Sequence, residues 1–272
     1  MSFYQQLTGL VAKGAGLLDE KSVIETRQFV VSLQNDDGGF SDRAGQSDLY
    51  YSLFAHFILK STWSGGYQQK LKSFVAEKGK GSGAHLVDLC CLAILHKELN
   101  GTFFAGLNYL VSALKYLKPS KYGGSRAYPY FLLFLAFDVY GFNNRLTRWL
   151  ARRFYRDEAL NGLPCPALAA QIVFKNQLGH RVKNDSNLLF SYFDDRLGFK
   201  VFPETEKADL LSTSVALVAL KTGGADLTLV APACFRLVEA NFRDGAFLSG
   251  DGDPHRDTEY TFYGLLALGA LA

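Results

Sequence analysis

Aspartates at the starts of apolar segments are the residues of this sequence whose type and position could do chemistry. The candidate catalytic residues are Asp48, Asp88, Asp209, Asp257 and Tyr260. Tyr260 follows Asp257 by three residues, which is about one turn of a helix. A carboxylate can accept a proton, hold a cation or accept a hydrogen bond, and a phenol beside it can donate one. We therefore expect these side chains to border any site of reaction.

Aromatic and small polar residues near the starts of the same segments are expected to line the space beside the carboxylates. The candidate substrate-binding residues are Tyr51, Phe54, His85, Cys91, Tyr128, Tyr130, Ser212 and Tyr263. Concave apolar sites with a few polar groups are the common form of a ligand pocket. Two simpler interpretations stay open. The rings could fill a solid core, and the aspartates could only cap helices, because Asp accepts hydrogen bonds from the free amides of a helix N-terminus.

The segments that carry these residues belong to an internal repeat. Three copies align by eye: QNDDGGFSDRAGQSDLYYS, DDRLGFKVFPETEKADLLSTS and RDGAFLSGDGDPHRDTEYTFY. Each has an Asp, a Gly, an aromatic residue, a polar loop and a later Asp that opens an apolar run. Weaker copies fill the interval, so that the apolar runs begin near residues 48, 88, 128, 166, 209 and 257. A period of about 40 to 48 residues is typical of arrays of helical hairpins.

The two halves of each repeat differ in a way that predicts how they are arranged. The first half, such as VIETRQFVVSLQ, has the apolar spacing of an amphipathic helix with one wet face. The second half, such as LYYSLFAHFIL, is apolar nearly all round and must be buried on every side. We therefore predict one all-α domain over residues 1–272, an (α/α)6 toroid with outer and inner rings of helices and no sheet. An open solenoid would leave one face of the second helices in water.

The repeat resembles that of the protein prenyltransferase β subunits and of the squalene and terpene cyclases. The pattern Q-x-x-D-G-G-F is followed by a short polar loop with Arg43, then by Asp48 and an aromatic helix. The segment DGAFLSGDGDPHRDTEYTFYGLLALGAL is similar to the last repeat of the β subunits. This resemblance implies an α/α toroid that acts on an isoprenoid-like substrate in its central cavity.

The catalytic motifs of those enzymes are not present in this sequence. The resemblance implies a zinc-binding histidine three residues after Asp257, where this chain has Tyr260. It also implies an Asp-x-Cys at the head of the preceding apolar helix, where Asp209 is followed by Leu210 and Leu211. The DxDD segment that the cyclases use to protonate their substrate does not occur anywhere in the sequence.

A metal site of another origin is the alternative that we weigh at the second repeat. Its LVDLC stretch contains Asp88 and Cys90, with His85 about one turn earlier, and these residue types are good zinc ligands. A carboxylate at a helix start and a buried thiol explain the same residues without a metal. We therefore predict no metal and no cofactor.

Composition excludes several other functional classes. The net charge of +3 over 272 residues implies neither nucleic acid nor an acidic membrane as a partner. No apolar run approaches the roughly 18 to 20 residues of a transmembrane helix, and the first residues do not have the pattern of a signal peptide. The cysteines show no CxxC pair, which predicts reduced, buried thiols. We expect a cytoplasmic protein.

One basic segment stands apart from the repeat pattern. The stretch RLTRWLARRFYR places arginines at helical spacing along one face: Arg145, Arg148, Arg152 and Arg156. They predict either a solvated helix face or a docking surface for an acidic protein partner or a diphosphate-bearing substrate.

Two functions remain open from the sequence. The first is a divergent terpenoid cyclase-like or prenyltransferase-like protein, a transferase or isomerase, that acts on or binds an isoprenoid-like apolar substrate in the central cavity. The second is a non-catalytic toroid that binds a lipid or a protein and has lost the zinc and DxDD motifs. The apolar, aromatic helices favour the first, and the missing motifs favour the second.

Overall fold

Helices form most of the chain. The computed structural model describes residues 2–63, 65–81, 85–101, 104–117, 127–155, 160 and 162–272. After α1 (Phe3–Ala15), the helices alternate between an outer and an apolar set. The apolar set is α3 (Leu49–Thr62), α5 (Leu86–Asn100), α7 (Ala127–Val139), α9 (Cys165–Gln177), α11 (Leu210–Thr222) and α13 (Thr258–Leu271). The outer set is α2 (Glu20–Ser32), α4 (Tyr67–Lys78), α6 (Phe104–Leu114), α8 (Arg145–Phe154), α10 (Lys183–Leu189) and α12 (Ala231–Ala240), and 3-10 turns span Lys115–Leu117 and Phe190–Tyr192. This architecture confirms the prediction of a mainly helical fold.

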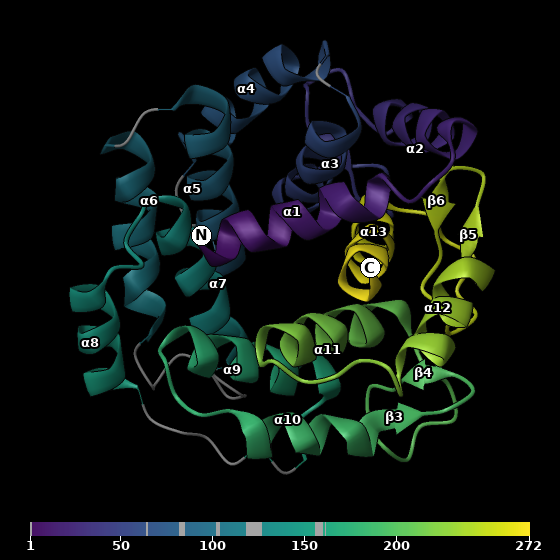
Figure 1. Cartoon of the computed structure of the whole chain (residues 1–272). Coiled ribbons are helices and arrows are strands. Elements are labelled where there is room, and N and C mark those ends of the chain that lie inside the picture. Colours follow the sequence, from purple (N-terminus) through teal and green to yellow (C-terminus); the bar gives the residue numbers. More distant parts are fainter. Residues whose placement is uncertain are drawn as a thin grey trace.

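The apolar helices follow one another around a closed circuit. Each packs against the next from α3 to α11, and α13 packs against both α11 and α3. Figure 1 shows the outer set placed around this circuit. The starts of the apolar helices differ by one or two residues from those that the repeat predicts. Segments that are apolar all round therefore lie where they have protein on every side.

Short strands were not expected, and the prediction of no sheet was wrong in this detail. The loops of the three strongest repeat copies each contain an antiparallel pair of two-residue strands. The pairs are β1 (Phe40–Ser41) with β2 (Ser47–Asp48), β3 (Phe193–Asp194) with β4 (Gly198–Phe199), and β5 (Phe242–Arg243) with β6 (Ala246–Phe247). In the first repeat the hairpin encloses the polar loop and ends at the start of α3, whereas in the other two repeats the hairpin comes before the polar loop.

The aromatic residue of each strong repeat explains why these hairpins are fixed. Phe40, Phe199 and Phe247 are at most 1% exposed, so each ring anchors its loop in the core. The backbone N–H of each phenylalanine donates to a hydroxyl in the second turn of the following apolar helix. The acceptors are Ser52 Oγ at 2.8 Å, Thr213 Oγ1 at 3.0 Å and Thr261 Oγ1 at 3.4 Å. The repeat motif is therefore a packing and hydrogen-bonding unit.

Helix α1, which the repeat did not predict, lies across the end of the circuit at which the apolar helices terminate (Figure 1). Its first turn is held by Asp138 of α7, whose buried Oδ2 accepts the N–H of Tyr4 at 2.6 Å. Its last turn crosses α13 at Gly14, where a Cβ atom would lie 1.8 Å from the carbonyl oxygen of Leu265. The two helices therefore pack with their backbones in contact.

A buried polar network joins α3, α4 and α5 near the same end. The carboxylate of Glu98 forms an ion pair with Lys60 and lies 3.5 Å from Nε2 of His56. The other ring nitrogen of His56 lies 3.2 Å from the hydroxyl of Tyr67. Burial opposes the charge on Glu98, but His56 and Lys60 outweigh it and lower the pKa of Glu98 to about 2.

The Glu98→Gln variant is expected to lose about 2 to 3 kcal/mol of unfolding free energy at pH 7. The pKa of this carboxyl is lower in the folded protein than in the unfolded chain. Its contribution is therefore complete above the unfolded value and falls as the pH falls towards the folded one. Urea unfolding at pH 7 and pH 3 should show that the difference from wild type shrinks by more than half. An equal difference at both pH values would contradict the assignment.

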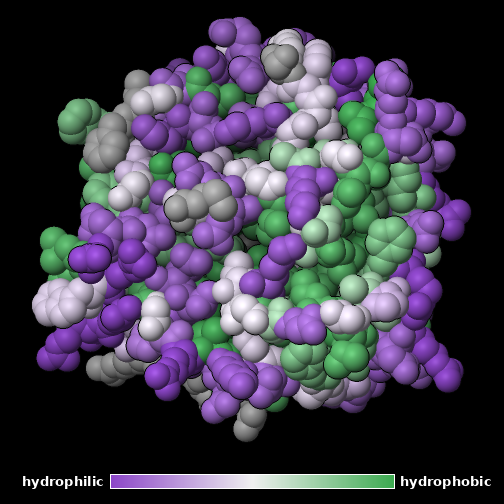
Figure 2. All heavy atoms as spheres, in the orientation of Figure 1, coloured by the Kyte–Doolittle hydropathy of each residue, from purple (hydrophilic) through white to green (hydrophobic). Residues whose placement is uncertain are grey.

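The surface seen from the α1 side is mostly polar at its margin. Figure 2 shows hydrophilic atoms around most of the edge and hydrophobic atoms gathered near the centre. Among the helices in the described ranges, none has the length and apolar character to cross a membrane.

Candidate functional site

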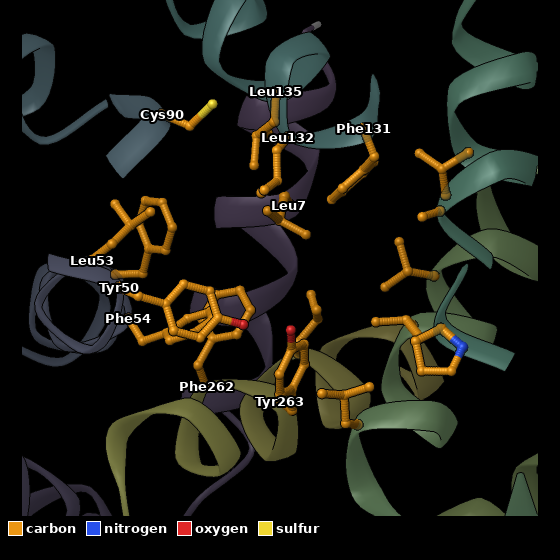
Figure 3. Close-up of a pocket in the computed structure, with 18 of the residues that line it drawn as sticks. Leu7, Tyr50, Leu53, Phe54, Cys90, Phe131, Leu132, Leu135, Phe262 and Tyr263 are labelled. Carbon is orange, nitrogen blue, oxygen red and sulfur yellow. The ribbon is translucent and has the colours of Figure 1, made fainter. Parts of the chain in front are cut away.

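The apolar helices enclose a cavity of about 250 Å³. Its wall receives residues from α1 and from every helix of the apolar set. Figure 3 shows Leu7, Phe131 and Phe262 among the side chains that border it. This volume exceeds the roughly 150 Å³ of an apolar cavity that admits benzene. The centre of the circuit is therefore not completely filled by side chains.

The wall follows helical spacing along each apolar helix. On α3 it consists of Tyr50, Leu53, Phe54 and Phe57, at positions i, i+3, i+4 and i+7. Sequence reasoning selected only Phe54 from this stripe. The missing signal was the rotation of the helix about its own axis, because a helix that is apolar all round does not mark which face looks inward.

Three of the predicted substrate-binding residues reach the cavity. Phe54, Cys91 and Tyr263 form part of its wall. Phe54 packs its ring against Tyr263 at 5.6 Å between centroids, which joins α3 to α13 at this place. Burial raises the pKa of the Cys91 thiol well above its usual value, so this residue contributes an uncharged surface.

Other predicted residues lie elsewhere. The cavity wall takes Leu211 and Val215 from α11, whereas Ser212 is fully buried and its carbonyl oxygen accepts the Cys165 thiol at 3.7 Å. Tyr130 stacks on Phe174 with ring centroids 5.9 Å apart.

Tyr51, which was also predicted to bind substrate, is not part of the cavity wall. Tyr51 is half-buried, and its carbonyl oxygen accepts the hydroxyl of Thr258 at 2.9 Å. Burial and the charges of Asp257 and Glu259 raise the pKa of Tyr51 to about 12. The side chain of Tyr128, in α7, lies outside the part of the chain that the structure describes.

Three of the four candidate aspartates cap the apolar helices. Asp48, Asp209 and Asp257 precede the first residues of α3, α11 and α13. In each, Oδ1 accepts an N–H of the first turn, from Tyr51 at 3.0 Å, Ser212 at 2.7 Å and Tyr260 at 2.8 Å. Capping accounts for Oδ1 of each carboxylate, and Oδ2 takes no part in these bonds.

Asp88 does not occupy the equivalent position, contrary to the expectation. Helix α5 begins at Leu86, so Asp88 is its third residue and its Oδ2 accepts the N–H of the N-cap residue His85 at 3.1 Å. Cys90, also considered as a metal ligand, is buried, and burial raises its pKa to about 12. Within the described ranges, no three His, Cys, Asp or Glu side chains are grouped to hold a metal ion.

Arg43 links the first repeat loop to the last. Its guanidinium donates to Oδ2 of Asp257 at 2.8 Å and to Asp253 at 2.7 Å. It also lies over the ring of Tyr260, 5.4 Å from the centroid. Asp257 is 3% exposed, so this ion pair is largely removed from water on one side. The contact closes the circuit at the end where the apolar helices begin.

The Asp257→Asn variant is expected to lose about 1 to 3 kcal/mol of unfolding free energy, because it leaves Arg43 with a neutral partner. Asn caps a helix about as well as Asp, so the capping bond to Tyr260 is kept. The matched control is Asp48→Asn, where the carboxylate accepts two capping bonds, from the N–H groups of Tyr50 and Tyr51 in the first turn. Chemical denaturation should show a change within about 0.5 kcal/mol for the control. Equal losses in the two variants would contradict the role given to Arg43.

A second hollow opens at the N-terminal ends of α11 and α13. It is lined by Asp209, Leu211 and Tyr260, the positions at which the resemblance implies zinc ligands in other proteins. A leucine cannot bind zinc, and burial, with the charge of Asp209, raises the pKa of Tyr260 to about 12. These residues therefore do not fit a zinc ion.

No family model and no curated protein sequence matches this chain.

The arginines of the basic segment lie on α8. Arg145 and Arg152 are exposed and Arg148 is half-buried, whereas Arg156 lies outside the described residues. The Nε atom of Arg152 donates to the carbonyl oxygen of Leu178, so this arginine has a structural contact. The basic segment thus has an exposed arginine, Arg145, and an arginine that contacts the segment after α9, Arg152.

Proposed function

We propose that the closed circuit is an (α/α)6 toroid of the kind found in prenyltransferase β subunits and terpene cyclases. In this proposal its central cavity binds an isoprenoid-like or other long-chain apolar ligand. The observation that carries the proposal is the cavity of about 250 Å³, with walls from α1 and all the apolar helices. The strict alternation of outer and apolar helices supports the toroid and one domain over residues 1–272.

The chemistry of the wall supports an apolar ligand. Leucine, valine, alanine and phenylalanine side chains form most of it, and the polar atoms that border it come from tyrosine hydroxyls and cysteine thiols. A polar group placed there without a hydrogen-bond partner would cost roughly 1 to 3 kcal/mol or more. A hydrocarbon chain instead gains free energy for each methylene group that leaves water.

An acid that is hydrogen-bonded to a residue of the cavity wall favours catalysis over passive binding. Tyr50, part of the cavity wall, donates its hydroxyl to Oε1 of Glu259 at 2.9 Å. Burial raises the pKa of Glu259 above its usual value, although the Tyr50 bond lowers it. A carboxyl group with a raised pKa is suited to proton transfer. We therefore propose a transferase-like or isomerase-like enzyme, with Glu259 rather than the capping aspartates as its acid.

The alternative is a non-catalytic toroid that binds a lipid or a protein. The feature that favours a protein partner is α8, where Leu146, Trp149 and Leu150 are 64%, 60% and 41% exposed beside Arg145. An acidic helix with apolar residues would complement this face. Both the catalytic and the non-catalytic proposal place the protein in the cytoplasm. The state of the cysteines supports this location, because all four are free and buried, as is usual in a reducing compartment.

The test is binding of neutral apolar probes to purified protein. Native mass spectrometry should detect a retained ligand, or a 1:1 complex after addition of farnesol or n-decanol. Calorimetric titration should give saturable binding of the same alcohols. If no ligand is retained and neither alcohol binds, the proposal is wrong.

A further inference from the structure

The hollow beside α11 and α13 is acidic. Its lining residues are Val201, Glu204, Thr205, Glu206, Lys207, Asp209, Leu211, Asp251 and Tyr260. Lys207, the cation of this set, donates to the backbone carbonyl oxygen of Asp251, at 2.5 Å. The nearby Arg43 is already bound to Asp253 and Asp257. The carboxylates of this hollow therefore outnumber the cations that are available to them.

Asp209 carries a buried oxygen that lacks a hydrogen-bond partner among the described residues. Its side chain is 7% exposed, and its Oδ1 accepts the N–H of Ser212 at 2.7 Å. Its Oδ2 is shielded from solvent and has no hydrogen-bond partner among the described residues. In the equivalent Asp257 the same oxygen accepts a hydrogen bond from Arg43 at 2.8 Å. A buried carboxylate oxygen without a donor is costly, and a bound cation removes this cost.

The charged neighbours of Asp209 do not supply that cation. Burial raises the pKa of Asp209, the capping bonds of Ser212 lower it, and the negative charge of Asp251 raises it further. The carboxylate of Asp251 is itself held by the hydroxyl of Ser249 and the N–H of Asp253. A ligand that brings a positive charge into this hollow would thus meet two carboxylates.

The hollow adjoins the central cavity. Leu211 lines both spaces, and on α13 Tyr260 lines the hollow while Tyr263, about one turn later, lines the cavity. Leu211 therefore stands where the two spaces meet, and a chain-like molecule that passed it would place its end group beside Asp209. No other described side chain is common to the linings of the two spaces.

We propose that the hollow at Asp209 binds the protonated amine of an amphiphilic ligand whose hydrocarbon chain lies in the central cavity. This inference rests on the proposed function and specifies its substrate class. An ammonium group has three donors and no acceptor, which suits a carboxylate that lacks a donor. A carboxylate or phosphate head group would be repelled by Glu204, Glu206, Asp209 and Asp251. A metal ion is not favoured, because Leu211 and Tyr260 complete the site.

The experiment compares three probes that share one chain and differ in head group: n-decylamine, n-decanol and decanoate. Calorimetric titration of the wild-type protein at pH 7 should give the tightest binding for decylamine, about tenfold or more tighter than decanol. Decanoate should bind more weakly than decanol. This comparison needs no variant. If decanol or decanoate binds as tightly as decylamine, the inference is wrong while the proposed function stands. If none of the probes binds, both are wrong.

Asp209→Asn locates the amine. The amide keeps the capping bond to Ser212 but loses the charge, so decylamine affinity should fall about tenfold with decanol affinity unchanged. The matched control is Glu239→Gln, an exposed carboxylate on α12 outside the hollow, for which a change of less than threefold is expected. An unchanged preference for decylamine in Asp209→Asn would overturn the assignment of the site. If this variant does not fold, Leu211→Lys, which places an ammonium of the protein itself in the hollow, should abolish the preference.

Discussion

Replacing Gly14 by alanine is expected to lower the free energy of unfolding by about 3 kcal/mol and the unfolding midpoint by roughly 5 to 10 °C. The added Cβ would lie 1.8 Å from the carbonyl oxygen of Leu265, and the reciprocal atom on Gly269 would lie 1.8 Å from that of Leu10. These are backbone atoms, so no side-chain rotation relieves the clash. Helix α1 must then separate from α13, and the cavity loses part of its wall at Phe3 and Leu7.

The matched control is Gly9→Ala in the same helix. Gly9 is exposed, and no heavy atom lies within 4 Å of where its Cβ would be. Because alanine has a higher helix propensity than glycine, this variant should gain about 0.5 to 1 kcal/mol. Thermal and urea unfolding of the two variants measure the difference directly. A Gly14→Ala protein as stable as Gly9→Ala would show that α1 does not pack on α13 in this way.

Replacing Val215 by tryptophan is expected to weaken the binding of farnesol and n-decanol strongly without loss of stability. Val215 borders the cavity of about 250 Å³, so the indole enters empty space instead of displacing packed atoms. Filling a cavity adds contacts, and substitutions of this kind commonly stabilise a protein by about 0.5 to 2 kcal/mol. The ligand must then compete with a ring that is attached to the wall. Binding should weaken by at least a factor of about 30, because roughly 2 kcal/mol of apolar burial is lost.

Leu229→Trp is the control for this variant. Leu229 is 83% exposed and lies outside the cavity wall, so the same tryptophan there should leave alcohol binding unchanged. Calorimetry with both alcohols, together with thermal unfolding, separates blocked binding from misfolding. Wild-type affinity in a stable Val215→Trp protein would place the ligand outside the central cavity. Should Val215→Trp prove unstable, Val215→Phe adds a smaller ring to the same space.

The starts of the apolar helices could be predicted because each signal is local. An aspartate followed by an apolar run needs only its own first turn to act as a cap, and Asp48, Asp209 and Asp257 do so. At Asp88 the same pattern misled, because His85 supplies the N-cap and the helix begins earlier. An aspartate near a helix start can thus form local hydrogen bonds either as the N-cap residue or as the third residue of the helix.

The cavity wall and α1 could not be predicted for a different reason. Leu211 and Ser212 are adjacent, but a rotation of about 100° per residue places only Leu211 at the cavity. Which face of α11 points to the cavity is set by the packing of this helix against α9 and α13. Likewise, the role of Gly14 depends on Gly269, which is distant in the sequence. The unpaired oxygen of Asp209 is a further example, since its equivalent in Asp257 is satisfied by Arg43 from the first repeat.

The packing of α1 against α13 also determines when the protein can finish folding during synthesis. The apolar circuit closes only when α13 meets α3, and α1 obtains its main partner at the same moment. Until the ribosome has released α13, the nascent chain carries helices that are apolar all round and have an uncovered side. Such intermediates are prone to aggregate, and contacts of long sequence separation form slowly. We therefore expect truncation before Thr258 to give insoluble protein, even though most of the repeats are present.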